Sequence, residues 1–123
     1  MVMKKIIIPL LTVIVLTLSA HAQPKDSLYV VTYTAGSSWD VNKPPHEQPY
    51  FKAHSARLGQ LRKDGVIKFG ARYGEKGMIV ISALTYSAAK EIVTTDDAVI
   101  NNLFVTDVQR LNIFYDGCLE RPK

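Results

Sequence analysis

The chain is poor in cysteine, because its 123 residues include only Cys118. A single cysteine excludes an internal disulfide, so a domain built from this sequence depends on a hydrophobic core for its stability. We interpret Cys118 as an inert side chain near the C-terminus. A disulfide between two subunits is the less favoured alternative.

The sequence also lacks a strong excess of charge of either sign. It has 15 basic and 11 acidic residues, a net charge of +4. Two of the basic residues, Lys4 and Lys5, lie in the leader described below, and the rest of the chain carries +2. No segment combines clustered basic residues with aromatic ones, which excludes a nucleic-acid partner. The glycine-rich segment Gly70–Gly77 is not followed directly by a helix and lacks the spacing of a P-loop or dinucleotide-binding motif. This excludes a phosphate-binding loop.

Long apolar runs are missing except at the N-terminus. Lys4 and Lys5 precede the uncharged run Ile6–Leu18, and the segment Ser19-Ala20-His21-Ala22 then places small residues at the expected cleavage site. This pattern predicts a secretory signal peptide at residues 1–22. A membrane anchor is the alternative, but the run is shorter than the roughly 20 residues of a spanning helix. No cysteine follows it to carry a lipid, so we expect an exported, periplasmic or extracellular protein without membrane contact.

Residues 23–123 are predicted to form a single domain with one small core. The β-branched and aromatic residues at 28–35 predict a strand that is apolar on both faces, which is typical of a strand covered on both sides. One face carries Leu28 and Val30, and the other carries Tyr29, Val31 and Tyr33. A long loop follows at 36–49 and contains the only tryptophan, Trp39. Long loops in compact domains are often functional or mobile.

A helix is predicted from Pro49 to about Asp64, because proline suits a first helical turn and Gly65 supplies the stop. One face of this helix is apolar and consists of Tyr50, Phe51, His54, Leu58 and Leu61. His54 therefore lies on the face that points to the sheet.

The remaining pattern predicts two strands, a helix and a last strand. The strands lie at 66–69 and 78–84, joined by a hairpin loop at 70–77. A helix at 87–94, capped by Thr85 or Ser87, leads through a turn at Asn101-Asn102 to a long strand at 103–114 and a polar tail. The order predicts a ferredoxin-like βαββαβ fold of the α+β class, with a four-stranded antiparallel sheet and two helices on one face. Because Tyr29, Val31 and similar side chains cannot all lie under the helices, we expect a second subunit to cover the other face in a homodimer.

His54 is the leading candidate for chemistry, because imidazole changes charge near neutral pH and suits proton transfer. The alternative is a core histidine with a satisfied hydrogen bond. Asp96 and Asp97, after the second helix, are candidates for a carboxylate that orients the ring, or for a solvated pair. Their spacing alone brings neither of them near His54.

Further candidates are weaker. Arg57, one turn after His54, can bind an anionic substrate or pair with Asp64 or Glu47. Tyr33 and Trp39 are candidates for lining a pocket or for core packing. Four residues have metal-ligand side chains, but Pro49 interrupts their spacing, so we predict no metal site and no cofactor. These four are His46, Glu47, His54 and Asp96.

Several short segments occur in an order that resembles a known family. The run PYFKAHSARL at 49–58 is followed by Leu61, Asp64-Gly65 and Gly70. In the second half, GMIVI at 77–81, Ala88-Ala89 and DDAV at 96–99 continue the pattern. Over about Leu28–Phe114, the chain resembles the YCII-related (YciI-like) family. Asp97 and Ala71 stand where that family commonly has proline.

The resemblance implies a dimer of the wider dimeric α/β barrel group, with a His–Asp pair in a pocket of each subunit. By position, His54 matches the family histidine and Asp96 the family aspartate. One branch of the family removes chloride from a chlorinated hydroquinone, and the wider group includes lactone isomerases.

We therefore expect a cofactor-free lyase or isomerase in which His54 transfers protons and Asp96 orients it. Arg57, Tyr33 or Trp39 would bind a small aromatic or anionic substrate. Two alternatives stay open: a non-catalytic module that binds a small ligand or an envelope protein, and an assembly protein with a contact surface around Trp39.

Overall fold

The computed structural model describes residues 2–4 and 25–123. Apart from residues 2–4, the predicted signal peptide lies outside this range. Within the described part of the chain, no helix has the length and apolar character needed to cross a membrane.

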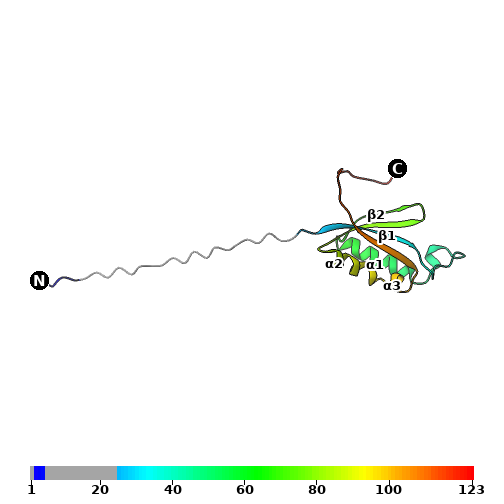
Figure 1. Cartoon of the computed structure of the whole chain (residues 1–123), viewed down its shortest axis with the longest axis horizontal. Helices are drawn as coiled ribbons and strands as arrows, with labels where there is room; N and C mark the ends of the chain where they lie inside the picture. The colour runs from blue at the N-terminus through cyan, green and yellow to red at the C-terminus, as the bar shows by residue number, and fades with distance from the viewer. Residues whose placement is uncertain (1, 5–24) are drawn as a thin grey trace.

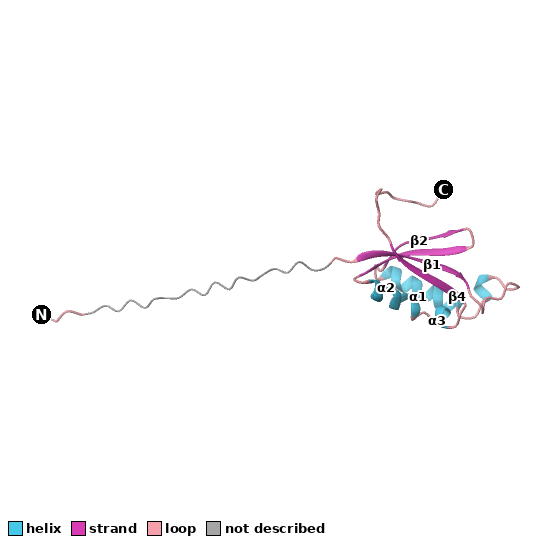
Figure 2. Cartoon of the chain, in the orientation of Figure 1, coloured by secondary structure: helices cyan, strands magenta, loops and turns pink. Residues whose placement is uncertain are grey.

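The described residues form an α+β fold with a four-stranded sheet. The elements are β1 (Ser27–Ala35), a 3-10 turn (Pro45–Glu47), α1 (Phe51–Lys63), β2 (Ile67–Tyr73), β3 (Lys76–Ala83), α2 (Tyr86–Thr94), α3 (Asp97–Ile100) and β4 (Phe104–Arg110). The strand order is β2-β3-β1-β4, and all neighbouring strands are antiparallel. Figure 1 shows the helices on one side of the sheet, and the colouring of Figure 2 separates the two layers. The predicted ferredoxin-like arrangement is confirmed.

The core lies between the sheet and the helices. The helix-facing side of β1 carries Tyr29, Val31 and Tyr33, and all three are buried. Register pairs Val31 with Ile79 on β3 and with Val108 on β4. Because paired residues of antiparallel strands point to the same side, these side chains form one apolar surface. Helix α2 covers it with Ala89 and Val93.

This arrangement corrects the reason we gave for a covered second face. Tyr29, Val31 and Tyr33 alternate with the other face, so all three do point at the helices. The opposite face carries Leu28, Val30 and other partly exposed side chains of β1. Figure 1 shows the C-terminal segment on that side of the sheet.

The predicted bounds of the hairpin loop and of the last strand are wrong. Residues 70–73, 76 and 77 belong to strands and not to a loop, because Gly74 adopts a φ of 55° and closes a tight turn between Tyr73 and Lys76. The last strand ends at Arg110 and not at Phe114. Its partner β1 begins at Ser27, which the same register sets opposite Asn112, so the chain beyond residue 112 has no strand residue of β1 to pair with.

The helices agree with the prediction apart from one addition. Helix α1 begins at Phe51, and Thr85 caps α2 by accepting a hydrogen bond from the backbone N–H of Ala88. The addition is α3, a single turn that begins after Asp96. Four residues are too few for an apolar period to be recognised in the sequence.

The loop after β1 packs closely on the segment after α3. Gly36 N–H donates to the carbonyl of Leu103 at 2.8 Å, and Ser38 N–H donates to Asn102 at 2.9 Å. A Cβ atom at Gly36 would overlap the carbonyl oxygen of Asn102. The backbones can therefore approach this closely only when residue 36 is glycine.

We expect Gly36→Ala to lower the free energy of unfolding by about 1–3 kcal/mol, because the backbone must shift to admit the methyl group. Gly59→Ala is the matched control. Gly59 lies in α1, and a Cβ there meets no atom of the described residues within 4 Å, so alanine should stabilise the helix by about 0.5–1 kcal/mol. Urea denaturation of both variants measures the difference. Equal stability of Gly36→Ala and the wild type would contradict the packing described here.

Candidate functional site

His54 lies at the centre of the candidate site, on the inner face of α1. Its residue is 6% exposed, as the apolar stripe predicted. Three aromatic rings surround it: Phe104 at 4.9 Å between centroids, Tyr33 at 5.2 Å and Phe51 at 6.2 Å. These contacts restrict the ring to one orientation.

Asp96 reaches His54 from the other half of the chain. The distance between Nδ1 of His54 and Oδ2 of Asp96 is 2.6 Å, and both residues are buried. The second carboxylate oxygen, Oδ1, accepts a hydrogen bond from the backbone N–H of Ala98 at 2.9 Å, as the cap of α3. Both oxygens of Asp96 are thus occupied, and the carboxylate is fixed relative to the ring.

The surroundings of Asp96 favour its ionised form. Burial alone raises the pKa of this carboxyl, but the hydrogen bonds from His54 and Ala98 and the charges of His54 and Arg57 outweigh it. The net result is a pKa below the usual range of aspartate. An ionised carboxylate only accepts hydrogen bonds, so Nδ1 of His54 carries the proton that joins the pair. Nε2 is the ring nitrogen left for a ligand.

Tyr33 supplies a neutral phenol beside His54. Burial is the main cause that raises its pKa, the charge of Asp96 raises it further, and Arg57 opposes both. The phenol therefore stays protonated well above neutral pH, which leaves its O–H as a hydrogen-bond donor.

His54 and Tyr33 line a cleft of about 700 Å³ between α1, the loop at 36–50 and the β2–β3 hairpin. This size suits a small organic ligand. The walls are largely apolar and aromatic, with Trp39, Phe51, Leu58, Met78, Ile79 and Phe104 among them. Of the predicted ligand-binding residues, the structure places Tyr33 and Trp39 in this cleft.

A buried glutamine holds the loop wall of the cleft in place. Gln48 is 4% exposed. Its Nε2 donates to the carbonyls of Asp40 at 2.6 Å and Lys43 at 2.9 Å, and its Oε1 accepts from the N–H of Asp40 at 2.9 Å. Trp39 packs against Phe104, with centroids 5.7 Å apart. The predicted functional loop is therefore an ordered wall.

We expect Gln48→Ala to open this wall, because three loop groups lose their partner at a cost of about 1–3 kcal/mol. Trp39 is the only tryptophan, so its fluorescence reports the change directly. Gln60→Ala is the control, since among residues 2–4 and 25–123 the Gln60 side chain bonds only the exposed Asp64. An unchanged Trp39 spectrum in Gln48→Ala would show that Gln48 does not hold the loop.

Arg57 has a different place from the one predicted for a substrate-binding residue. Its Nη2 donates to the carbonyl of Ile92 and to Oγ1 of Thr95, both at 2.8 Å. It is not among the residues that line the cleft. Within the described residues, Arg57 pairs with neither Asp64 nor Glu47. Asp64 accepts a hydrogen bond from Gln60, and Oε1 of Glu47 lies 3.8 Å from Nε2 of His46. Arg57 joins α1 to the end of α2 and acts on Asp96 by charge alone.

The other candidates lie apart from His54. Asp97 is exposed at the start of α3. His46 and Glu47 form an exposed pair in the loop. Over residues 2–4 and 25–123, no group of three or more His, Cys, Asp or Glu side chains could hold a metal ion.

Sequence reasoning missed the two charged residues of the cleft that lie in the β2–β3 hairpin, Arg72 and Glu75, and the glycines beside them. Arg72 lines the cleft from β2, next to Gly70 and Gly77. These positions were predicted to be loop, so no face was assigned to them. Strand alternation through Gly74 would have placed Gly70 and Arg72 on the same side.

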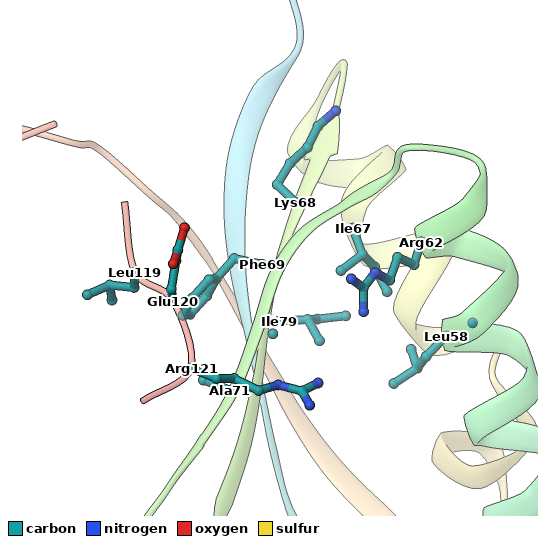
Figure 3. A pocket seen from close by; sticks show the side chains of 12 residues that line it. Leu58, Arg62, Ile67, Lys68, Phe69, Ala71, Ile79, Leu119, Glu120 and Arg121 are labelled. Carbon is teal, nitrogen blue, oxygen red and sulfur yellow. The ribbon is translucent and has the colours of Figure 1, made fainter. Parts of the chain in front are cut away.

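A second groove of about 840 Å³ lies along the edge strand β2. Figure 3 shows Leu58 and Arg62 of α1 on one side of β2, and Leu119, Glu120 and Arg121 of the C-terminal segment on the other. The groove contains neither His54 nor Asp96. We therefore place the candidate site in the cleft beside His54.

A scan against protein-family models finds no match, and a search of curated proteins finds no relative. The resemblance to the YCII-related family therefore stays a prediction.

Proposed function

We propose that the protein is a small cofactor-free enzyme of the lyase or isomerase type, with His54 as its acid and base. The observation that carries the proposal is the buried pair at 2.6 Å between Nδ1 of His54 and Oδ2 of Asp96, at the wall of a cleft. A fixed carboxylate on Nδ1 sets the tautomer of the ring and stabilises the imidazolium. The His54–Asp96 pair supports this role better than a His–Asp contact on the surface would, because both residues are buried.

The proposed step is a proton transfer at carbon. Nε2 takes a proton from a carbon next to a carbonyl, and the electron pair of the C–H bond moves into the enolate. The phenol of Tyr33 donates a hydrogen bond to the enolate oxygen, where the charge develops. The imidazolium then returns the proton to a carbon or to a leaving group. Asp96 stays ionised throughout and positions the ring.

We also propose membership of the YCII-like family, export from the cell and a homodimer. The dimer would form through the sheet face opposite the helices, where Leu28 and Val30 are half-buried and Val105 is 56% exposed. Light scattering tests the dimer, and a monomer at micromolar concentration would contradict it.

Deuterium exchange tests the proposed chemistry. Phenylpyruvate is a suitable probe, because it is a small aromatic carboxylate whose benzylic carbon lies next to a carbonyl. In D₂O, we expect the protein residues 23–123 to accelerate the loss of the benzylic proton signal in NMR. A rate equal to that of buffer, with phenylpyruvate bound, would favour the non-catalytic binding module.

A further inference from the structure

We infer that the cleft binds a small planar carboxylate, with Arg72 pairing with the carboxylate and Gly70 and Gly77 making room for the apolar body. This inference rests on the proposed function, because it names the substrate class of the same site. It is carried by the register of the β2–β3 hairpin and by the charges that line the cleft.

Arg72 is placed on the helix-facing side of the sheet by register. It pairs with Gly77 on β3, and Gly77 pairs with Tyr33 on β1. Paired residues share a face, and Tyr33 is buried under the helices. Arg72 therefore extends over the same side of the sheet as Tyr33, toward the cleft that both residues line.

Arg72 is the one permanently charged cation among the described residues that line the cleft. Within the described chain, it forms no ion pair within 4.0 Å. Glu75 also lines the cleft, and both side chains are exposed, but Glu75 lies in the hairpin turn while Arg72 lies on the strand β2. The guanidinium fork of arginine matches a carboxylate with two parallel hydrogen bonds. The second nearby cation, Arg57, is already bonded to α2.

Two glycines hollow the sheet beside Tyr33. Gly70 pairs with Ile79 and Gly77 with Tyr33, so both lie on the helix-facing side where a side chain would enter the cleft. Among the described residues, a Cβ at Gly77 would meet only Cβ of Tyr33, at 3.7 Å. A Cβ at Gly70 would meet Cγ2 of Ile79 at 3.7 Å and the carbonyl oxygen of Met78 at 3.8 Å. These are ordinary contacts, so neither position requires glycine for packing. What their small size provides is open space next to Arg72.

The rest of the lining fits a flat apolar body. Trp39, Phe51 and Phe104 line the cleft with Tyr33. Aromatic side chains pack on planar rings by offset or edge contacts. A ligand with its carboxylate at Arg72 and its ring among these side chains lies in the cleft that His54 lines.

The test compares phenylacetate with phenylacetamide, which have the same shape but differ in charge. Binding to residues 23–123 is followed by Trp39 fluorescence and by NMR shifts of the His54 ring. Hydrogen bonds to a charged group are stronger than neutral ones, so we expect phenylacetate to bind about 10- to 100-fold more tightly. Arg72→Gln should bind the two compounds equally, while Arg121→Gln, in the other groove, should keep the preference.

Gly77→Val tests the position of the ligand independently. Valine suits a strand, so this variant should keep the thermal midpoint of the wild type and lose binding of both compounds. Three results would overturn the inference: no binding of phenylacetate, equal binding of both compounds by the wild type, or unchanged binding by Gly77→Val. These measurements need no turnover. Normal phenylacetate binding without exchange on phenylpyruvate would therefore contradict the acid–base proposal alone.

Discussion

Replacing His54 by alanine should lower the rate of deuterium exchange on phenylpyruvate by about 100- to 10,000-fold, the usual contribution of a positioned acid or base. The reason is geometric: Nε2 is the only ring nitrogen of His54 that Asp96 does not occupy. Exchange is measured by the loss of the benzylic proton signal in D₂O. The residual rate should come from Tyr33 and from binding in the cleft.

Two controls separate a catalytic loss from a structural one. His46→Ala changes an exposed histidine of the loop and should exchange phenylpyruvate at the wild-type rate. His54→Gln keeps a polar side chain of similar length but cannot act as a base near neutral pH. It should still bind phenylacetate while exchange is lost. Full activity of His54→Ala would remove His54 from the mechanism.

Replacing Asp96 by alanine should lower the free energy of unfolding by about 3–5 kcal/mol, which is typical when one partner of a buried pair is removed. The variant leaves Nδ1 of His54 and the N–H of Ala98 without their acceptor in a buried site. Asp97→Ala is the matched control, because Asp97 is the next residue in the chain and its side chain is exposed. It should cost less than about 1 kcal/mol. An Asp96→Ala variant as stable as the wild type would contradict the buried pair.

The lowered pKa of Asp96 predicts the sign of its pH dependence. Because the pKa is lower in the folded protein than the ordinary 3.8, the folded state binds this proton less readily than the unfolded chain. The stabilisation is complete above about pH 4 to 5, and it is lost as the pH falls through the folded pKa. Urea denaturation between neutral and acidic pH measures it. The stability of Asp96→Asn should change less over the same range, and parallel curves for both proteins would contradict the assignment.

The order of the elements could be predicted because each one has a clear local signal. The strand at 28–35 is β-branched, the helix at 49–64 has an apolar face, and Gly65 ends it. The errors lie where a partner decides the boundary. The last strand cannot pair with β1 as far as Phe114, because β1 begins at Ser27, opposite Asn112, and no pattern within residues 103–114 contains that information.

The candidate site was only partly predictable for the same reason. The helical period places His54 on the inner face, but Asp96 is 42 positions away in sequence. Its approach depends on how α3 packs after α2, which spacing does not encode, and only the family resemblance pointed to the pair. Arg57 was predicted to bind substrate, but in the fold it donates hydrogen bonds to Ile92 and Thr95 at the end of α2. Arg72 was missed because the tight turn at Gly74 was predicted to be part of a longer loop.

The state of the His54 ring in the cleft tests the central claim most directly. A long-range proton–nitrogen NMR spectrum distinguishes the two ring nitrogens of His54. We expect Nδ1 to carry the proton donated to Asp96, and we expect added phenylacetate to shift Nε2. Asp96→Asn should abolish the fixed proton on Nδ1. A ring that carries its proton on Nε2 in the wild type, or one that phenylacetate leaves unchanged, would contradict the assignment of His54 as the acid and base of this cleft.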